Sequence, residues 1–372
     1  MEKTSGSGRI CAGIDYREGR PRVCYQTEQM KEPQELPLNF EKQTGHAACL
    51  RKILSALKRY GKKEDIRAAV VLPDMSEESI RQTLKEAYEA GFQEGQLQVM
   101  GELESLVHFV MHQTNDIWQQ QVWILEFGTD EVKATGIQAN KRSIPIVTEA
   151  REPEYWYVGN LLEGNRDERL LQQVRERFGK NSNRVSAVFL TGTDLNTRDY
   201  KKSREEICSR RRVFLGDLLH ARGACMLAGD RTEHRQYLYL SEQTLLYNVQ
   251  IRSSRDGKEE LCTIVRAGLN WYEAGESCEV LLCSEPLLEF SFQSMLGGEP
   301  IRAGMHLPDL PERPRGTSRL LVEVYFSAPA QCEIEVTDLG FGELYPSSDL
   351  CWKETFILEE QEEVSHGTGY GL

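Results

Sequence analysis

Two segments of the chain each place an acidic side chain at the end of an apolar strand. Residues 9–25 (RICAGIDYREGRPRVCY) and 122–137 (VWILEFGTDEVKATGI) both predict a strand, a tight polar turn and a return strand. Asp15 ends the first outgoing strand, and Glu126 ends the second. Carboxylates at such positions can hold a hydrated magnesium ion, because magnesium is bound through one or two carboxylates and keeps several waters.

The turn of the first hairpin carries basic side chains that could act on an anion. Arg17, Arg20 and Arg22 offer guanidinium groups, which hydrogen-bond strongly to phosphate oxygens. In the same turn, Glu18 repels a phosphate and Pro21 has no backbone N–H to donate. The sequence therefore favours ordinary solvated turn residues, with a side-chain anion site as the alternative.

A strand and a helix connect the two hairpins and must position their acids. The continuous apolar run AAVVLP (68–73) is typical of a buried parallel strand. The helix after it has two candidate N-caps, Asp74 and Ser76. Gly91 is expected to end this helix, because glycine readily adopts the left-handed conformation at a helix C-terminus.

A further helix is predicted from Glu102 to about His112, after a strand at 96–100. His108 and His112 lie four residues apart and therefore on one side of this helix, as metal ligands do. The sequence shows neither an HExxH motif nor a third ligand nearby. We therefore interpret both side chains as core or surface histidines rather than as ligands.

The second half of the chain repeats the alternation of strands and helices. We expect a strand and a helix within 160–179, a buried strand at 184–193, and a strand followed by a helix at 210–229. Such alternation indicates an α/β layer fold. After about residue 235 the helical pattern stops, and short strands between Gly, Pro and Asp turns predict a β-sandwich.

These segments give the expected domain organisation. A core domain occupies 1–230, with lobes at about 1–117 and 118–230, and each lobe contains one hairpin. The β-sandwich occupies 231–358. The tail at 359–372 is acidic and then glycine-rich, so we expect it to be disordered because it cannot bury enough apolar surface.

The order of these segments resembles that of the 70-kDa heat-shock chaperones, in which a β-sandwich that binds substrate follows an actin-like ATPase. GID (13–15) resembles the start of the family's phosphate loop GIDLGTT, and LEFGTDEVKATGI (125–137) resembles its second phosphate hairpin, DLGGGTFDVSI. VFLTGTDLNTRDYKK (188–202) resembles the adenosine segment, and GDLLHARGACMLAG (216–229) resembles the second connecting helix. With the sandwich, the resemblance covers about residues 9–340.

The resemblance implies an actin-like, ribonuclease H-like two-lobed core with ATP or ADP and Mg²⁺ as cofactors. It implies catalytic roles for Asp15, Glu102 and Glu126, with Asp15 and Glu126 holding the magnesium ion through water. The residues that it places at the nucleotide are Gly13, Gly128, Thr129, Gly192, Thr193 and Gly223. Arg17 is expected to bind the nucleotide as well, as a replacement for the family's phosphate contacts in the first turn.

The chain also departs from this family where catalysis would occur. The first turn lacks the Gly-Thr-Thr run, the second lacks the Gly-Gly run, and no residue can be assigned to the family's catalytic lysine. The intervals Asp15–Leu72 and Gly128–Gly192 are far shorter than in the chaperones, where they contain the outer subdomains that close over the nucleotide. We therefore expect a core that lacks the outer subdomains and has a weak or inactive nucleotide site, since water weakens electrostatic stabilisation of phosphoryl transfer.

These features predict a chaperone-like binding or scaffolding protein whose β-sandwich holds a protein or peptide partner. The apolar stretch 281–296 is the expected lining of a peptide groove, with ordinary sandwich core as the alternative. Two other functions stay open, an ATP-dependent ATPase of the chaperone type and an actin-like assembly protein. The sequence leaves the oligomeric state open.

Composition argues against other classes of function. The formal net charge of −13 falls wholly within 231–372, because residues 1–230 hold equal numbers of acidic and basic side chains, and such a field repels nucleic acid. No apolar run approaches the roughly 18 residues that a membrane span needs. The ten cysteines show no paired metal-ligand spacing and indicate reduced core thiols in a cytoplasmic protein.

Overall fold

The computed structural model of the chain divides after Leu240 into two units, 1–240 and 241–372. The expected disordered tail, 359–372, and the predicted nucleotide contact Thr193 lie outside the residues that the structure describes. The described residues are 8–17, 19–41, 45–143, 145–159, 164–179, 184–192, 195, 199–230, 237–255, 258–283 and 285–358.

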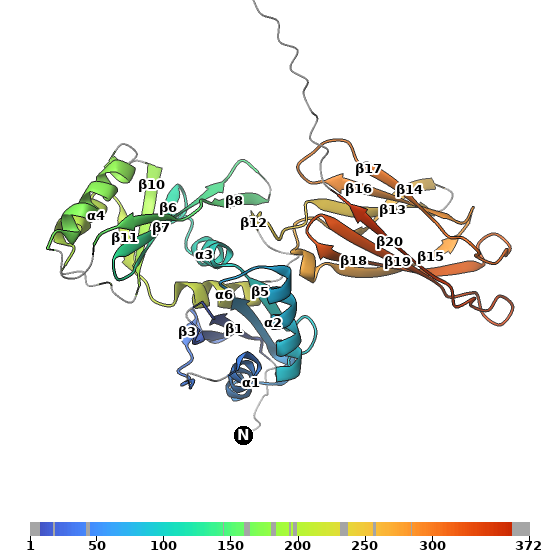
Figure 1. The fold of residues 1–372 in the computed structure, drawn as a ribbon, viewed down its shortest axis with the longest axis horizontal. Helices are drawn as coiled ribbons and strands as arrows, with labels where there is room; N and C mark the ends of the chain where they lie inside the picture. The colour runs from blue at the N-terminus through green and yellow to red at the C-terminus, as the bar shows by residue number, and fades with distance from the viewer. Residues whose placement is uncertain are drawn as a thin grey trace, which may run out of the picture. The chain divides into compact units, whose positions relative to one another are not determined.

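The first sheet of the N-terminal unit has the strand order β3-β2-β1-β4-β5 (Figure 1). β1 pairs antiparallel with β2 and parallel with β4, and β4 pairs parallel with β5. All six residues of β1 are buried, as the apolar run ICAGID requires. The strands are β1 (Ile10–Asp15), β2 (Arg22–Thr27), β3 (Gln34–Glu35), β4 (Ile66–Val71) and β5 (Leu97–Met100).

Two helices follow the strands of this sheet, α1 (His46–Leu57) and α2 (Glu77–Ala90). Ser76 is the N-cap of α2, because its side chain accepts a hydrogen bond from the backbone N–H of Ser79. Asp74, the other candidate, instead accepts hydrogen bonds from Ser76. Gly91 ends α2 in the left-handed conformation, as predicted.

The second sheet repeats the first, with β6 in the place of β1. Its order is β11-β10-β6-β7-β8-β12, in which β6 pairs antiparallel with β7 and parallel with β10, and β10 pairs parallel with β11. The prediction of an α/β core built on two hairpins is therefore confirmed. The strands are β6 (Gln121–Phe127), β7 (Glu131–Asn140), β8 (Ile146–Ala150), β9 (Glu154–Tyr157), β10 (Val185–Thr191), β11 (Arg212–Leu215) and β12 (Tyr237–Tyr239).

Three of these strands differ from the expected organisation. β8 and β9 were not predicted; both pair with β7. β12 pairs parallel with β8 and so belongs to the N-terminal unit, whereas the boundary at 230/231 assigned it to the sandwich. Strands of three to five residues are too short for a clear alternation of apolar and polar side chains, so the sequence does not reveal them before their partner strands are known.

Two helices at the centre of this unit pack on the sheet of the other lobe (Figure 1). α3 (Glu102–Met111) belongs by sequence to the first lobe, but its apolar residues pack in the core of the second sheet with β6 and β10. α6 (Leu219–Gly229) belongs by sequence to the second lobe, but it packs on the first sheet against β1 and β4. This exchange ties the two lobes together through the backbone.

The remaining helices cover the second sheet. α4 (Arg166–Val174) and α5 (Lys201–Ile207) pack their apolar side chains on one core cluster with β6 and β10. α4 lies where the sequence predicted a helix within 160–179. None of the helices in the described part of the chain has the length and apolar character needed to cross a bilayer.

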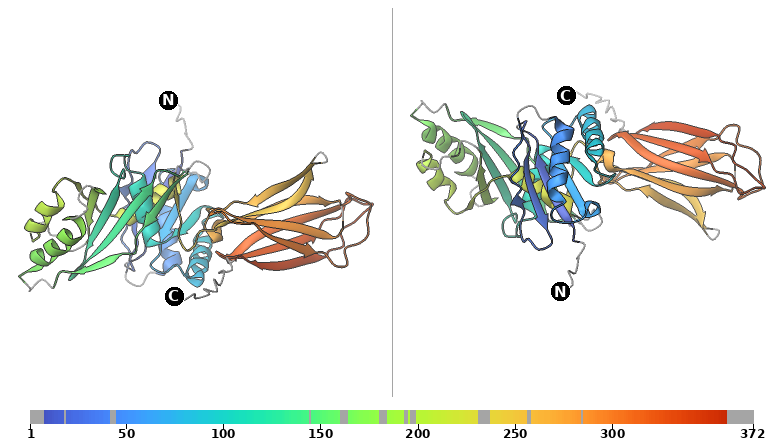
Figure 2. Two further views of the ribbon diagram at one scale, coloured as in Figure 1. Left: turned by 90° about the horizontal axis from the view of Figure 1, so that it is seen from above. Right: turned by 90° about the horizontal axis from the view of Figure 1, so that it is seen from below.

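The C-terminal unit consists of two four-stranded antiparallel sheets, with orders β14-β13-β16-β17 and β15-β18-β19-β20. Figure 2 shows these sheets as two layers. Burial alternates along β18 and β19, as in strands with one face in a core. The Phe356 ring lies 6.2 Å from Phe290 and 5.4 Å from Phe292, so side chains of the two sheets meet. The strands are β13 (Tyr247–Arg255), β14 (Lys258–Val265), β15 (Gly275–Leu282), β16 (Leu287–Ser294), β17 (Ile301–His306), β18 (Ser318–Ala328), β19 (Gln331–Asp338) and β20 (Cys351–Ile357).

The stretch 281–296 does not form the expected pair of groove-lining strands. Its first residues end β15 and its later ones form β16, and these strands belong to different sheets. Phe290 and Phe292 are buried in the core, which is the alternative interpretation of this stretch. The apolar pattern was correct, but it cannot distinguish a core strand from a groove.

The cysteines are divided between the interior and the surface. All ten are free thiols, and five of them are buried. The expectation of core thiols is wrong for four that are exposed, Cys208, Cys262, Cys283 and Cys351.

Candidate functional site

The three predicted acids converge on one guanidinium group, that of Arg17. Asp15 ends β1, Glu102 begins α3 and Glu126 lies near the end of β6. Arg17 Nε lies 3.0 Å from Asp15 Oδ1, and its Nη1 lies 3.7 Å from Glu102 Oε1 and 3.5 Å from Glu126 Oε1. A cation of the chain itself therefore lies among the carboxylates expected to hold a magnesium ion.

The pairing of Arg17 with Asp15 is bidentate. Arg17 Nε and Nη2 donate to the two carboxylate oxygens of Asp15, each at 3.0 Å, and the backbone N–H of Arg17 donates to Oδ1 at 3.2 Å. Such fork-to-fork pairs are stronger than single contacts. The side chains are 15% and 8% exposed, so solvent screens the pair little.

Arg17 keeps its charge in this setting. Burial alone would lower the pKa of Arg17, but the hydrogen bonds to Asp15 and the charges of Asp15, Glu126 and Glu102 outweigh burial and raise it. The first-turn arginine is therefore neither a solvated turn residue nor an unoccupied anion site, because its guanidinium is already paired with carboxylates.

The second hairpin acid is paired with a buried histidine. His220 Nε2, from α6, lies 3.0 Å from Glu126 Oε1, and His220 is 2% exposed. On its other side, His220 Nδ1 lies 2.7 Å from Ser105 Oγ, and that hydroxyl donates to the backbone carbonyl of Glu102 at 2.6 Å. The chain of contacts links α6, α3 and β6.

Glu126 is ionised at neutral pH. Burial would raise the pKa of Glu126, but the hydrogen bond from His220 and the charges of His220, Arg17 and Lys133 together lower it to about 2. Its other oxygen, Oε2, is buried without a hydrogen-bond partner among the described residues. A water or a ligand could still use this oxygen as an acceptor.

The third acid, Glu102, is paired with Lys133 of β7. The ammonium group of Lys133 contacts Glu102 Oε2, while Glu102 Oε1 faces Arg17. Each acid of the site thus has at least one cationic or histidine partner from this chain. The site forms an internal ion-pair network that joins the two hairpins.

Two of the predicted nucleotide contacts, Gly13 and Gly223, lie where helices approach closely. A Cβ on Gly13 would lie 1.9 Å from the carbonyl oxygen of Ala221 and 2.3 Å from the amide nitrogen of Cys225, both in α6. A Cβ on Gly223 would lie 1.9 Å from the carbonyl oxygen of Ser105 in α3. Helix packing therefore requires both glycines, whether or not a ligand binds.

The remaining predicted contacts lie in the second hairpin and beside it. The Gly128 N–H donates to the carbonyl of Glu131 at 2.9 Å within the turn. Thr129 is exposed, and its carbonyl accepts a hydrogen bond from Arg166 at 2.9 Å. These groups are therefore engaged in local structure.

Gly192 lies against the backbone of β6 with a φ of +120°. A Cβ there would lie 2.3 Å from the carbonyl oxygen of Phe127, so only glycine fits this position. The close approach of two backbones therefore accounts for this glycine, which the resemblance had assigned to the nucleotide.

Sequence reasoning missed the two partners that complete the network, Lys133 and His220. Lys133 could have been found, because it lies directly opposite Glu126 in the register of the second hairpin. His220 carried no such signal, since it reaches Glu126 only through the packing of α6.

Two family models match the chain. Residues 39–242 match the C-terminal part of a family of unknown function, DUF5716, and residues 244–358 match a domain of unknown function, DUF8552. The chain belongs to the DUF5716 family. The two matched regions of this DUF5716 protein meet close to the division after Leu240. No curated protein matches the chain.

The solved structures that match the chain have low sequence identity to it. One is a Bacteroides thetaiotaomicron protein with actin-like ATPase fold and unknown function, at 10% identity and a TM-score of 0.35, over 62% of this chain and 100% of that one. Another is the ethanolamine utilization protein EutJ from Carboxydothermus hydrogenoformans, at 10% identity and a TM-score of 0.38, over 61% of this chain and 92% of that one. A third is a ROK hexokinase from Thermus thermophilus, at 11% identity and a TM-score of 0.38, over 59% of this chain and 98% of that one.

Proposed function

We propose that this DUF5716 protein is a non-hydrolysing, actin-like binding or scaffolding protein with a degenerate nucleotide site. The observation that carries the proposal is the position of Arg17 among Asp15, Glu102 and Glu126. The duplicated sheet order and the exchanged helices support a two-lobed core of the actin-like kind.

The charge arrangement opposes phosphoryl transfer. That reaction depends on metal ions that bridge phosphate oxygens and on acids free to orient them. In this network the acids are already neutralised by Arg17, Lys133 and His220. A magnesium ion would have to displace Arg17, and removing one partner of a buried ion pair leaves an uncompensated charge.

Calorimetric titration of ATP and of ADP with Mg²⁺ into the whole chain tests this proposal. We expect no saturable heat up to about 1 mM nucleotide, the range of the weakest specific binding, and no turnover. Steady hydrolysis that is lost in both Asp15→Asn and Glu126→Gln would overturn it. Arg20→Met, which removes an exposed arginine of the same turn, is the matched control.

A second candidate is an ATPase with rearranged phosphate contacts. The convergence of Asp15, Glu102 and Glu126, together with the unpartnered Oε2 of Glu126, favours it. In this case Arg17 would turn from the acids to the phosphates when nucleotide binds. Arg17→Met would then weaken nucleotide binding, whereas under the first proposal it changes stability alone.

We place the protein or peptide partner of this function on the C-terminal unit. Leu261 of β14 and Leu281 of β15 support this, because they are 53% and 49% exposed on strands at the edges of their sheets. Edge strands can add an extended peptide. An array of extended apolar peptides probed with the whole chain tests it: Leu281→Ser should lose binding, and Leu344→Ser, 87% exposed outside these strands, should not.

A further inference from the structure

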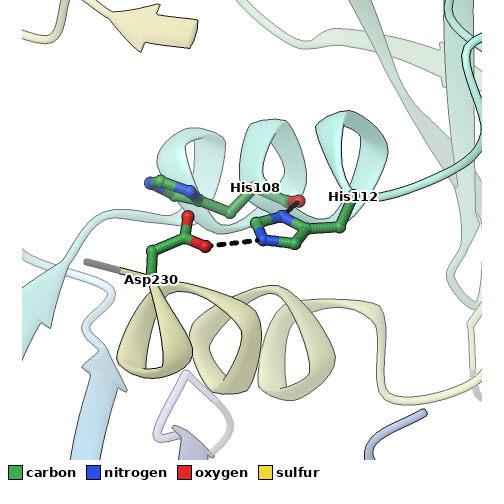
Figure 3. A group of neighbouring side chains, drawn as sticks. All are labelled: His108, His112 and Asp230. Atoms are coloured by element: carbon green, nitrogen blue, oxygen red, sulfur yellow. Dashed lines mark hydrogen bonds and ion pairs between the residues drawn. The ribbon is translucent and has the colours of Figure 1, made fainter. Parts of the chain in front are cut away.

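A second group of polar side chains lies at the opposite end of α3 from Glu102. His108 and His112 lie one turn apart near the end of α3, and Asp230 follows the last residue of α6 (Figure 3). One ligand atom from each of the three residues lies within 4.8 Å of the others. Asp230 is the third ligand that the sequence could not supply, because it is 118 residues from His112.

The His112 ring is oriented as a metal ligand. Its Nδ1 lies 2.7 Å from the backbone carbonyl oxygen of His108, and a carbonyl only accepts, so Nδ1 carries the proton. His112 Nε2 faces Asp230 Oδ1 at 3.0 Å. In a neutral ring this nitrogen bears a lone pair that can bind a metal ion, whereas in a protonated ring it donates a hydrogen bond to Asp230, so a metal ion would replace that proton. Metal-binding histidines are oriented in the same way, by a hydrogen bond from the nitrogen that does not bind the metal.

The His108 ring can present the same nitrogen. The Tyr237 hydroxyl lies 2.7 Å from His108 Nδ1 and 3.2 Å from His112 Nδ1. A hydroxyl oxygen can accept the N–H of His108 Nδ1, which leaves a lone pair on Nε2. His108 Nε2 lies 3.8 Å from Glu104 Oε1, one turn earlier on α3. Each ring thus turns its Nε2 toward a carboxylate.

Burial suits a bound ion with access from solvent. His108 is 2% exposed, whereas the side chains of His112 and Asp230 are 25% and 24% exposed. The partly exposed side gives an ion an entry path, and the buried side gives it a fixed ligand.

We propose that His108, His112 and Asp230 bind a zinc ion, with Glu104 or a water as the fourth ligand. Two imidazoles and a carboxylate are donors that zinc commonly takes. Tetrahedral zinc with bonds of about 2.1 Å separates its ligand atoms by roughly 3.3 Å, so small side-chain rotations bring these atoms into place.

The ion would fix the two lobes of the N-terminal unit relative to each other. α3 packs on the second sheet and α6 on the first, and the zinc ligands come from the C-terminal ends of both helices. The negative end of the α6 dipole adds to the attraction. This site is separate from the Arg17 network and does not depend on the proposed function.

Zinc titration into the whole chain, stripped with EDTA, tests the proposal. We expect one equivalent to bind by calorimetry and to raise the unfolding temperature. His112→Gln and the nearly isosteric Asp230→Asn should each weaken binding at least about 10-fold. His306→Gln, which removes an exposed imidazole of the C-terminal unit, should bind zinc as the parent chain does.

X-ray absorption at the zinc edge identifies the ligands, because four exposed thiols could also take the ion. We expect nitrogen and oxygen neighbours without sulfur. A sulfur shell, or equal affinity in His112→Gln and Asp230→Asn, would show that zinc binds elsewhere and would overturn the proposal. No zinc-dependent change in the parent chain would reduce the group to a hydrogen-bonded cluster and overturn it as well.

Discussion

The two hairpins of the N-terminal unit share a backbone plan but neutralise their acids in different ways. In the first hairpin, the partner of Asp15 is Arg17, two residues further along the chain. In the second, the partners of Glu126 are Arg17 from the other hairpin and His220, which is 94 residues away. The two hairpins thus share a strand order and the positions of their acids, while the partners of those acids come from different parts of the chain.

The helices show the same contrast. Counting back two residues from each acid, Gly13 in β1 corresponds to Ile124 in β6. Gly13 lets the backbone of α6 approach the first sheet, whereas Ile124 fills the core between α3 and the second sheet. The helix on the first sheet thus packs through backbone contact, whereas the helix on the second sheet packs through side chains. Substitutions at these two positions can test this difference.

The largest loss of stability should come from a side chain added at Gly13, where α6 packs on β1. Gly13→Ala would place a methyl group 1.9 Å from a backbone oxygen of α6. We therefore expect the free energy of unfolding to fall by more than about 4 kcal/mol, or the protein to fail to fold. Ile124→Ala should cost about 2–5 kcal/mol through a cavity. Hydrogen exchange of peptides from 8–159 measures both changes within this unit. Gly275→Ala, which meets nothing within 4 Å, is the control, and a harmless Gly13→Ala would refute the backbone contact.

The next effect should come from removing the shared cation. Arg17→Met leaves three carboxylates facing one another, and we expect a loss of about 3 kcal/mol, typical of breaking a buried ion pair. Urea unfolding followed by hydrogen exchange of β1 and β6 measures it. Arg20→Met should be nearly neutral; similar losses in both variants would mean that Arg17 is an ordinary turn residue.

Acid should weaken the second hairpin through Glu126. The pKa of Glu126 falls from 4.5 to about 2 on folding, so its stabilisation is present above pH 4.5 and is lost as the pH falls toward 2. The full effect is about 3–4 kcal/mol, of which roughly 2–3 kcal/mol is lost by pH 2.5, because a tenfold change in a protonation equilibrium corresponds to about 1.4 kcal/mol. Comparing the parent chain with Glu126→Gln between pH 6 and pH 2.5 isolates it. If the free energies of unfolding of the two proteins fell in parallel over this pH range, the pairing of Glu126 would be contradicted.

The smallest effect should come from the most exposed pair of the network. Lys133→Met removes one partner of Glu102, whose side chain is 29% exposed, and Arg17 remains beside it. We expect a loss of about 1 kcal/mol, near the upper end for partly exposed pairs. Thermal unfolding at low and high salt measures it. If Lys133→Met lowered the free energy of unfolding as much as Arg17→Met does, the cations of the two hairpins would contribute equally to stability.

Much of the backbone could be predicted from the sequence. Local patterns predict the two hairpins, the buried strand before α2, the end of α2 at Gly91 and the antiparallel C-terminal strands. They left Asp74 and Ser76 as alternative N-caps of α2, and the structure decides for Ser76. Errors fell on elements with little pattern of their own, such as β12, and on the stretch 281–296, whose apolar residues fit a core as well as a groove.

Of the candidate site, the sequence predicted the three acids and Arg17, although it assigned Arg17 to an anion or a nucleotide rather than to the acids. Asp15 and Glu126 carry local signals, because each lies at or near the end of a recognisable strand, whereas Glu102 was indicated by the resemblance to the chaperones. Their meeting with His220, and the meeting of His112 with Asp230, depend on two helices that pack on the sheet of the other lobe. Periodicity and caps determine where an element begins and which face is apolar, whereas the burial of that face against a distant sheet decides which charges meet.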